Sequence, residues 1–208
     1  MNPVDYELKL SRAFNKRTGR LSKELITKEK DRIKKALSLS DISKNSKVLL
    51  LGVGTGAQLD ECKRFTKFVK AIDLNARRRD IQKFDLNSGR LPFGSNSFDI
   101  VFALEIVEHL FYPNFVLNEI HRILKWGGQA IFSFPNEYTL INKIKFILDR
   151  QLEEHGFDTY GHHFLINEKN ATAFLIRKFT IEKREKLKDS RDPLRNFNES
   201  VFFKCIKK

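Results

Sequence analysis

The sequence has few of the features that mark secreted, metal-structured or membrane-spanning proteins. Its two cysteines, Cys62 and Cys205, lie far apart and have neither a metal-ligand spacing nor the density of a disulfide framework. No apolar run approaches the ~20 residues that cross a bilayer, and residues 1–10 lack the apolar core of a signal peptide. We therefore expect a soluble, cytoplasmic protein with no membrane partner and two buried, unreactive thiols.

The sequence also lacks internal repeats and low-complexity tracts. Apolar residues make up 41% of the 208 residues and 19 are phenylalanine, which is enough to build a packed core. The length suits one α/β domain and is too short for two substantial ones. We expect a helical extension or cap over residues 1–45 and one domain over residues 46–208, and the sequence does not indicate an oligomeric state.

The net charge of +13 is distributed unevenly. Residues 1–46 hold 12 basic and 6 acidic side chains, residues 47–140 hold 12 and 10, and residues 141–208 hold 15 and 10. The excess therefore lies in the flanks, where its field could attract an anionic substrate. A lysine-rich composition that serves only solubility accounts for the same numbers equally well.

Apolar runs alternate with helical patterns along the chain, which is typical of a mainly parallel sheet covered by helices on both faces. The helical spacing within residues 5–38 predicts one or two amphipathic helices before the first strand. Pro113 fits the start of a helix and Gly127-Gly128 its end. We expect a doubly wound α/β fold with a seven-stranded, mainly parallel sheet: strands at 47–51, 68–73, 81–84, 98–103, 129–134, 179–185 and 200–206, and helices at 56–65, 113–124, 137–152 and 167–176.

The apolar run Val48–Leu51 breaks into glycine at every second position, at Gly52, Gly54 and Gly56. This pattern predicts a buried strand that ends in a tight turn, where backbone N–H groups can approach a ligand. Asp73 ends the next apolar run, where an acid can accept hydrogen bonds from a ribose diol. The arginines at 77–79 would suit the 2′-phosphate of NADP, but Asp73 would repel that phosphate, so a free ribose diol is the better partner.

Further motifs follow in a defined order, and they decide the nature of the cofactor. With them, the span Val48–Asn136 resembles the class I S-adenosylmethionine-dependent methyltransferases. The resemblance implies a Rossmann-like methyltransferase fold with S-adenosylmethionine as cofactor and S-adenosylhomocysteine as product. The motifs are Phe84-Asp85-Leu86, Leu91-Pro92-Phe93, Asn96 to Val101, Glu105-Ile106-Val107-Glu108-His109-Leu110, and Arg122 to Gly128.

The resemblance also implies roles for individual residues. The three glycines would form the turn against the methionine moiety, Asp73 would bind both ribose hydroxyls, and Asp85 would accept from the adenine amino group. Two departures stand out: Leu50 occupies a position where many members carry an acid that anchors the donor's amino-acid end, and Trp126 replaces a common proline. That anchor would then come from elsewhere, such as the N-terminal helices. The apolar contacts to the cofactor would come from Leu74, Leu86, Ala103 and Leu104.

His109 is the candidate catalytic base, because it follows the fourth strand and an imidazole has a reference pKa near ~6.5. A histidine that merely caps or packs the short turn is an equally good interpretation. His155, His162 and His163 lie in the later segment where related enzymes build the acceptor site.

Glu105, Glu108 and His109 would share one side of a helix, at positions i, i+3 and i+4. With His162 or His163 they could hold a divalent cation, and the pattern is a partial match to the small-RNA 3′-terminal 2′-O-methyltransferases. The first half of the pattern is also similar to ubiquinone-pathway O-methyltransferases, and metal-free relatives carry it too. We therefore assign no metal ligand.

Three functions remain open at this stage. The first is methyl transfer to the O, N or C atom of a small, anionic acceptor. The second is RNA methylation, including metal-assisted 2′-O-methylation, which the basic balance favours. The third is a non-catalytic partner subunit that keeps the methyltransferase fold.

Overall fold

The computed structural model describes residues 23–135, 166–187 and 200–208. Within these ranges, no helix combines the length and the apolar character that crossing a membrane requires. The predicted helix at 137–152, the histidines at 155, 162 and 163, and the first part of the predicted N-terminal extension lie outside the described residues.

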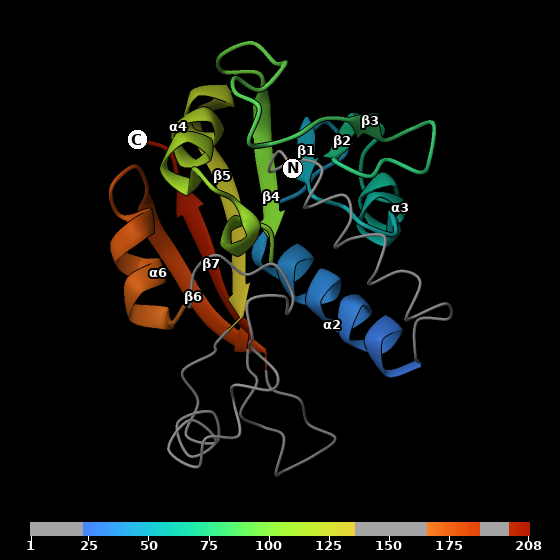
Figure 1. Ribbon diagram of the computed structural model, residues 1–208, viewed down its shortest axis with the longest axis horizontal. Helices are drawn as coiled ribbons and strands as arrows, with labels where there is room; N and C mark the ends of the chain where they lie inside the picture. Colours follow the sequence, from blue (N-terminus) through green and yellow to red (C-terminus); the bar gives the residue numbers. More distant parts are fainter. Residues whose placement is uncertain (1–22, 136–165, 188–199) are drawn as a thin grey trace, which may run out of the picture.

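Seven strands form one sheet in the order β3-β2-β1-β4-β5-β7-β6. Strands β1 to β5 pair in parallel, whereas β7 is antiparallel to both β5 and β6. Figure 1 shows this reversal, because the arrowhead of β7 points away from those of β4 and β5. The predicted seven-stranded, mainly parallel sheet is thus confirmed. Its strands are β1 (Val48–Leu51), β2 (Val69–Asp73), β3 (Gln82–Lys83), β4 (Phe98–Leu104), β5 (Leu124–Pro135), β6 (Thr180–Leu187) and β7 (Ser200–Ile206).

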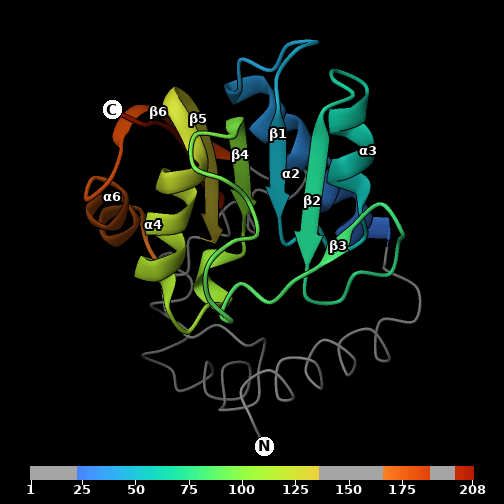
Figure 2. The ribbon, with the colours of Figure 1, turned by 90° about the horizontal axis from the view of Figure 1, so that it is seen from above.

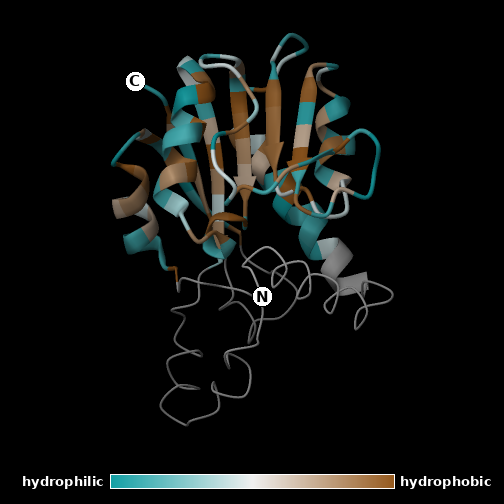
Figure 3. Ribbon diagram, turned by 45° about the horizontal axis from the view of Figure 1, so that its top comes forward, coloured by the Kyte–Doolittle hydropathy of each residue, from teal (hydrophilic) through white to brown (hydrophobic). Residues whose placement is uncertain are grey.

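Helices cover both faces of the sheet. Figures 1 and 2 show α4 and α6 on one side, and α2 and α3 on the other. The apolar side chains of β1 alternate accordingly: Leu49 and Leu51 pack with α4 and α6, whereas Val48 and Leu50 pack with α2 and α3. Figure 3 shows the apolar residues concentrated on the strands between these two layers. The helices are α2 (Lys23–Leu39), α3 (Ala57–Lys63), the 3₁₀ turn η1 (Val107–His109), α4 (Pro113–Ile123) and α6 (Glu168–Leu175).

The junction of α4 and β5 differs from the prediction. Pro113 stands in the first turn of α4, as expected, but the helix ends at Ile123 because Leu124 is already extended. Gly127-Gly128 therefore lie inside β5 and do not end the helix. A Cβ on Gly128 would lie 2.8 Å from the carbonyl oxygen of Lys125, so a close approach of backbone within the strand explains this glycine.

The remaining described elements agree with their predicted ranges. Asn167 caps α6 with its side chain and exchanges hydrogen bonds with Asn170, which forms a capping box. Both cysteines are buried, and burial raises the pKa of the Cys62 thiol to about 12. At neutral pH these thiols are therefore protonated and unreactive.

Candidate functional site

The predicted cofactor residues meet at the carboxyl edge of the sheet. Gly52 follows β1, Asp73 ends β2, Asp85 follows β3 and Leu104 ends β4. Because these strands are parallel, their carboxyl ends lie at the same edge. The chain leaves β1 toward β2 on one side and reaches β4 on the other, so β1 and β4 form the switch point where α/β sheets bind ligands.

The turn after β1 has left-handed backbone at Gly52, Gly54 and Gly56, with φ of 66°, 50° and 85°. A Cβ on Gly52 would lie 2.5 Å from Cδ1 of Ile106, and a Cβ on Gly56 would lie 2.8 Å from Nη1 of Arg78. At Gly54, by contrast, no heavy atom of the described structure lies within 4 Å of the added carbon. The backbone at Gly54 therefore faces open space that a ligand can approach.

The carboxylate of Asp73 is held by backbone donors on both sides. Its Oδ2 accepts from the N–H of Gly54 at 2.9 Å, and its Oδ1 accepts from the N–H of Asn75 at 2.7 Å. Each carboxylate oxygen has a second lone pair, so both can still accept a hydroxyl hydrogen bond. The glycine turn and the predicted ribose acceptor are thus directly linked.

Asp85 lies in the loop after β3, with its orientation fixed by an Asx turn. Its Oδ1 accepts from the N–H of Asn87 at 2.8 Å. Asn87 in turn accepts from the N–H of Phe111 at 2.9 Å, which ties this loop to the segment after η1. Among the residues predicted to make apolar contacts to the cofactor, Leu86, Ala103 and Leu104 are buried, and Leu74, just after β2, is half-buried.

Helix α2 brings two further polar residues to this edge, and Figure 1 shows it beside the arrowhead of β4. Thr55 of the glycine turn donates to Glu29 at 2.7 Å. Arg32 forms an ion pair with Glu105, which also accepts from the hydroxyl of Ser200. Sequence reasoning did not identify Glu29 and Arg32 individually. Two sequence features could have pointed to them. They are three residues apart, which places them on one side of α2, and Leu50 stands where an acid would anchor the donor.

The predicted helical grouping of Glu105, Glu108 and His109 is wrong. The 3₁₀ turn begins only at Val107, and Glu105 has a left-handed backbone with φ of 46°. Glu105 is ion-paired with α2, whereas Glu108 is fully buried and His109 is half-buried. Among the residues that the structure describes, no three His, Cys, Asp or Glu side chains lie close enough together to hold a metal ion.

Arg78, from the arginine run, has a structural role behind the glycine turn. Its guanidinium donates to both oxygens of Asp60 at 2.7 Å and to Asp80 at 2.8 Å. The hydrogen bonds from Arg78 hold the pKa of both carboxyls below their ordinary value. This fork fixes the start of α3 relative to Gly56, so Arg78 is engaged within the protein and not directed at a 2′-phosphate.

A relative from an archaeon matches part of this chain in sequence. An uncharacterized protein of Methanocaldococcus jannaschii is 35% identical over 141 residues, which cover 64% of this chain and 61% of that protein. The match therefore spans about three fifths of the relative's length.

Two solved structures share the fold. An S-adenosylmethionine-dependent methyltransferase from Mesorhizobium loti has a TM-score of 0.65 at 15% identity, covering 85% of this chain and 98% of that chain. The N-methyltransferase NodS from Bradyrhizobium japonicum, in complex with S-adenosylhomocysteine, has a TM-score of 0.62 at 15% identity, covering 86% and 87%. Residues 49–132 match the family model described as a methyltransferase domain. The strand order and the motif positions agree with that match, and the chain shares the fold of these methyltransferases.

Proposed function

We propose that the protein transfers a methyl group from S-adenosylmethionine to a small, negatively charged acceptor. The observation that carries the proposal is the link between Gly54 and Asp73, with open space beside the glycine. When bound, the donor supplies an electrophilic methyl group whose leaving group departs neutral. The protein then needs mainly to align the acceptor and remove a proton, which few side chains can do.

The residues at the carboxyl edge fit the nucleoside part of the donor. Asp73, already oriented by two backbone N–H groups, accepts from the ribose hydroxyls. Asp85 accepts from the adenine amino group, because its Asx turn fixes the carboxylate. Leu86 and Leu104 provide buried apolar contacts.

Arg32 and Glu105 fit the amino-acid end of the donor. The guanidinium of Arg32 binds a carboxylate, and the carboxylate of Glu105 accepts from an ammonium group. Their mutual ion pair lies next to Ile106, which packs against Gly52. The left-handed backbone of Glu105 is a costly conformation for a residue with a side chain, and such conformations cluster at ligand sites. This pair would replace the acid that is missing at Leu50.

An anionic acceptor is supported by the charge of α2. Residues 28–35 contain five basic and two acidic side chains, and Lys28, Lys30 and Lys34 are exposed. This helix contacts the glycine turn and the end of β4, so its field acts at the same edge as the donor. His109, in η1 after β4, is the base that removes the acceptor's proton.

A methyl-transfer assay tests the proposal. The protein is incubated with radiolabelled S-adenosylmethionine and either a fractionated pool of small metabolites or total RNA, with and without a chelator. We expect label in the anionic metabolite fraction, unaffected by the chelator. His109→Gln should lower kcat at least tenfold. His121→Gln, at the opposite end of α4, is the matched control and should change kcat little.

The other outcomes separate the alternatives. Label that enters only RNA would establish RNA methylation. Loss of methyl transfer in the presence of the chelator would indicate a metal-assisted reaction. Donor binding without transfer to either pool would support a non-catalytic subunit. Any of these three results contradicts the proposed reaction.

A further inference from the structure

The amino edge of the sheet, opposite the donor site, gathers basic and aromatic side chains. They come from the loop before β1, the starts of β2 and β5, the turn before β6 and the end of β7. We call this surface the basic-aromatic edge. It consists of Lys44, Lys47, Lys67, Phe68, Lys125, Trp126, Lys178 and Lys208.

The first part of this edge is linked by backbone contacts. The N–H of Val48 donates to the carbonyl of Phe68 at 2.9 Å, so the strands β1 and β2 begin side by side. The hydroxyl of Thr66 donates to the carbonyl of Lys44 at 3.0 Å. Lys44, Lys47 and Phe68 therefore belong to one continuous surface, and Lys67 places its Nζ 5.2 Å from the centroid of the Phe68 ring.

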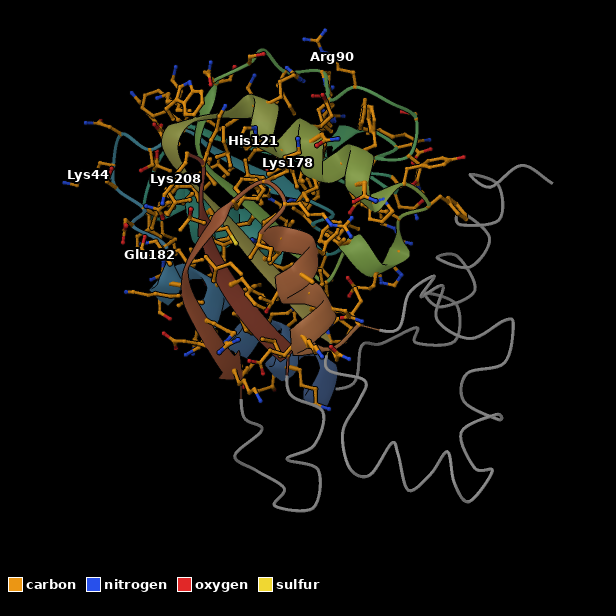
Figure 4. All side chains as sticks on the ribbon, turned by 90° about the vertical axis from the view of Figure 1, so that its left-hand side faces the viewer. Lys44, Arg90, His121, Lys178, Glu182 and Lys208 are labelled. Atoms are coloured by element: carbon orange, nitrogen blue, oxygen red, sulfur yellow. The ribbon has the colours of Figure 1, made fainter. Side chains whose placement is uncertain are left out.

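The second part continues from Asp99 to the end of β7. Asp99 accepts from the N–H of Lys47 at 2.8 Å and pairs with Lys125 at 2.6 Å. Next to Lys125, the ring of Trp126 has the Nζ of Lys207 5.1 Å from its centroid. Figure 4 shows Lys44, Lys178 and Lys208 at the same end of the molecule, with His121 between them.

Acidic side chains near this edge are paired with lysines. Asp99 pairs with Lys125, and Asp41 and Glu182 both bind the buried Nζ of Lys204, at 2.6 Å and 3.1 Å. Lys44, Lys47, Lys67, Lys178 and Lys208 are all exposed, so their charges face solvent. The field of this surface is therefore positive, which fits a polyanion.

The exposed rings distinguish between kinds of polyanion. Trp126 is 70% exposed and Phe68 is 43% exposed, which is unusual for large aromatic side chains. Each of these two rings has a lysine Nζ within about 5 Å of its centroid, 5.2 Å for Phe68 and 5.1 Å for Trp126. Rings beside phosphate-binding cations are what single-stranded nucleic acids require, because unpaired bases stack on aromatic side chains.

We propose that the basic-aromatic edge binds single-stranded nucleic acid, with Trp126 stacking on a base and the surrounding lysines contacting phosphates. The surface lies at the opposite edge of the sheet from Gly54 and Asp73. Binding there is thus a separate function that does not rest on the proposed methyl transfer.

The chain itself provides the probe, because Trp126 is the one tryptophan in the sequence. The full-length protein is titrated with oligo(U), oligo(dT), a duplex of the same length and anionic vesicles, while its intrinsic fluorescence is recorded. We expect quenching by the single strands, with a weaker effect of the duplex. The logarithm of the binding constant should fall linearly with the logarithm of the salt concentration, by about 0.7 per phosphate contact. Four lysine contacts therefore give a slope near −3.

Matched variants locate the surface. Lys44→Glu with Lys67→Glu should lower the affinity for labelled oligo(U) at least tenfold and reduce the salt slope. Lys34→Glu with Lys169→Glu makes the same charge change on α2 and α6 and should have little effect. Trp126→Ala should weaken binding at least fivefold, whereas Trp126→Phe should retain most of it.

Three outcomes would overturn the proposal. One is equal weakening by both charge-reversal pairs, which would mean attraction by net charge alone. Another is quenching by anionic vesicles but not by single strands, which would assign the edge to a membrane surface. The third is the absence of any saturable binding of nucleic acid by the wild-type protein.

Discussion

Gly52 and Gly54 both have a left-handed backbone, but only Gly52 has a side chain packed where its Cβ would be. Alanine at either position lowers the free energy of unfolding by roughly 1–2 kcal/mol, because the left-handed conformation is unfavourable for a residue with a side chain. At Gly52 the new methyl group would also displace Ile106, which lowers the free energy of unfolding by roughly a further 1–3 kcal/mol. We therefore expect Gly52→Ala to lower the free energy of unfolding in urea more than Gly54→Ala does.

A double-mutant cycle isolates the contact between Gly52 and Ile106. Ile106→Ala removes the two nearest atoms, Cδ1 and Cγ1, so Gly52→Ala should lower the free energy of unfolding less in that background than in the wild type. Equal unfolding free energies for Gly52→Ala and Gly54→Ala, or strict additivity in the cycle, would show that Ile106 does not constrain the glycine turn.

At the scale of elements, Glu119 fastens the loop before β4 to helix α4. Its carboxylate accepts from the N–H of Leu91 at 2.8 Å and from Arg122 at 2.7 Å. The hydrogen bonds from Arg122 hold the pKa of Glu119 below its ordinary value of 4.5. A carboxyl whose pKa is lower in the folded state than in the unfolded state stabilises the folded protein. This stabilisation is complete above the pKa of the unfolded state and is lost as the pH falls through the pKa of the folded state.

We therefore expect the free energies of unfolding of the wild type and of Glu119→Gln to differ by an amount that depends on pH. The variant should lose about 1–3 kcal/mol of unfolding free energy at pH 7, because the buried Leu91 amide and Arg122 lose their charged acceptor. The difference should shrink below pH 4.5. Urea unfolding at several pH values measures it, and a difference that is constant from pH 7 to pH 3 would contradict the assigned role.

Helix α2 reaches the carboxyl edge of the sheet through the ion pair of Arg32 with Glu105. If this pair holds the amino-acid end of the donor, as proposed, ligands with and without that end should respond differently to its loss. Arg32→Gln and Glu105→Gln should each weaken the binding of S-adenosylhomocysteine about tenfold or more, because charge-assisted hydrogen bonds to the amino-acid end are lost. Binding of 5′-methylthioadenosine, which lacks that end, should change little. Equal losses for both ligands in calorimetry would mean that the pair only supports the fold.

At the scale of the whole molecule, the sheet was predictable from the sequence because its parallel strands are buried on both faces. Leu49, Leu50 and Leu51 form a run whose burial needs helices on both sides, and Asp73 follows the neighbouring run. Local periodicity therefore indicated the strands, and the motif spacing indicated which residues lie together at the carboxyl edge.

Long-range contacts account for the errors and omissions. Gly128 suggested a helix end, but its lack of a side chain allows the close approach of the Lys125 backbone in β5 and of the Asp99 backbone in β4. Glu105 matched a helical spacing, yet its ion pair joins it to a residue 73 positions earlier. No local pattern specifies such pairs, so Arg32 became a candidate only when α2 was placed beside β4.

We propose that the glycine turn and Asp73 hold the nucleoside of S-adenosylmethionine. Calorimetric titration of the full-length protein with S-adenosylhomocysteine tests this, with Asp73→Asn alongside and Glu61→Gln as the control at a surface carboxylate of α3. We predict one site per chain, an affinity loss of about tenfold or more for Asp73→Asn, and a much smaller change for the control. The absence of binding by the wild type, or binding that Asp73→Asn leaves unchanged, would contradict the account.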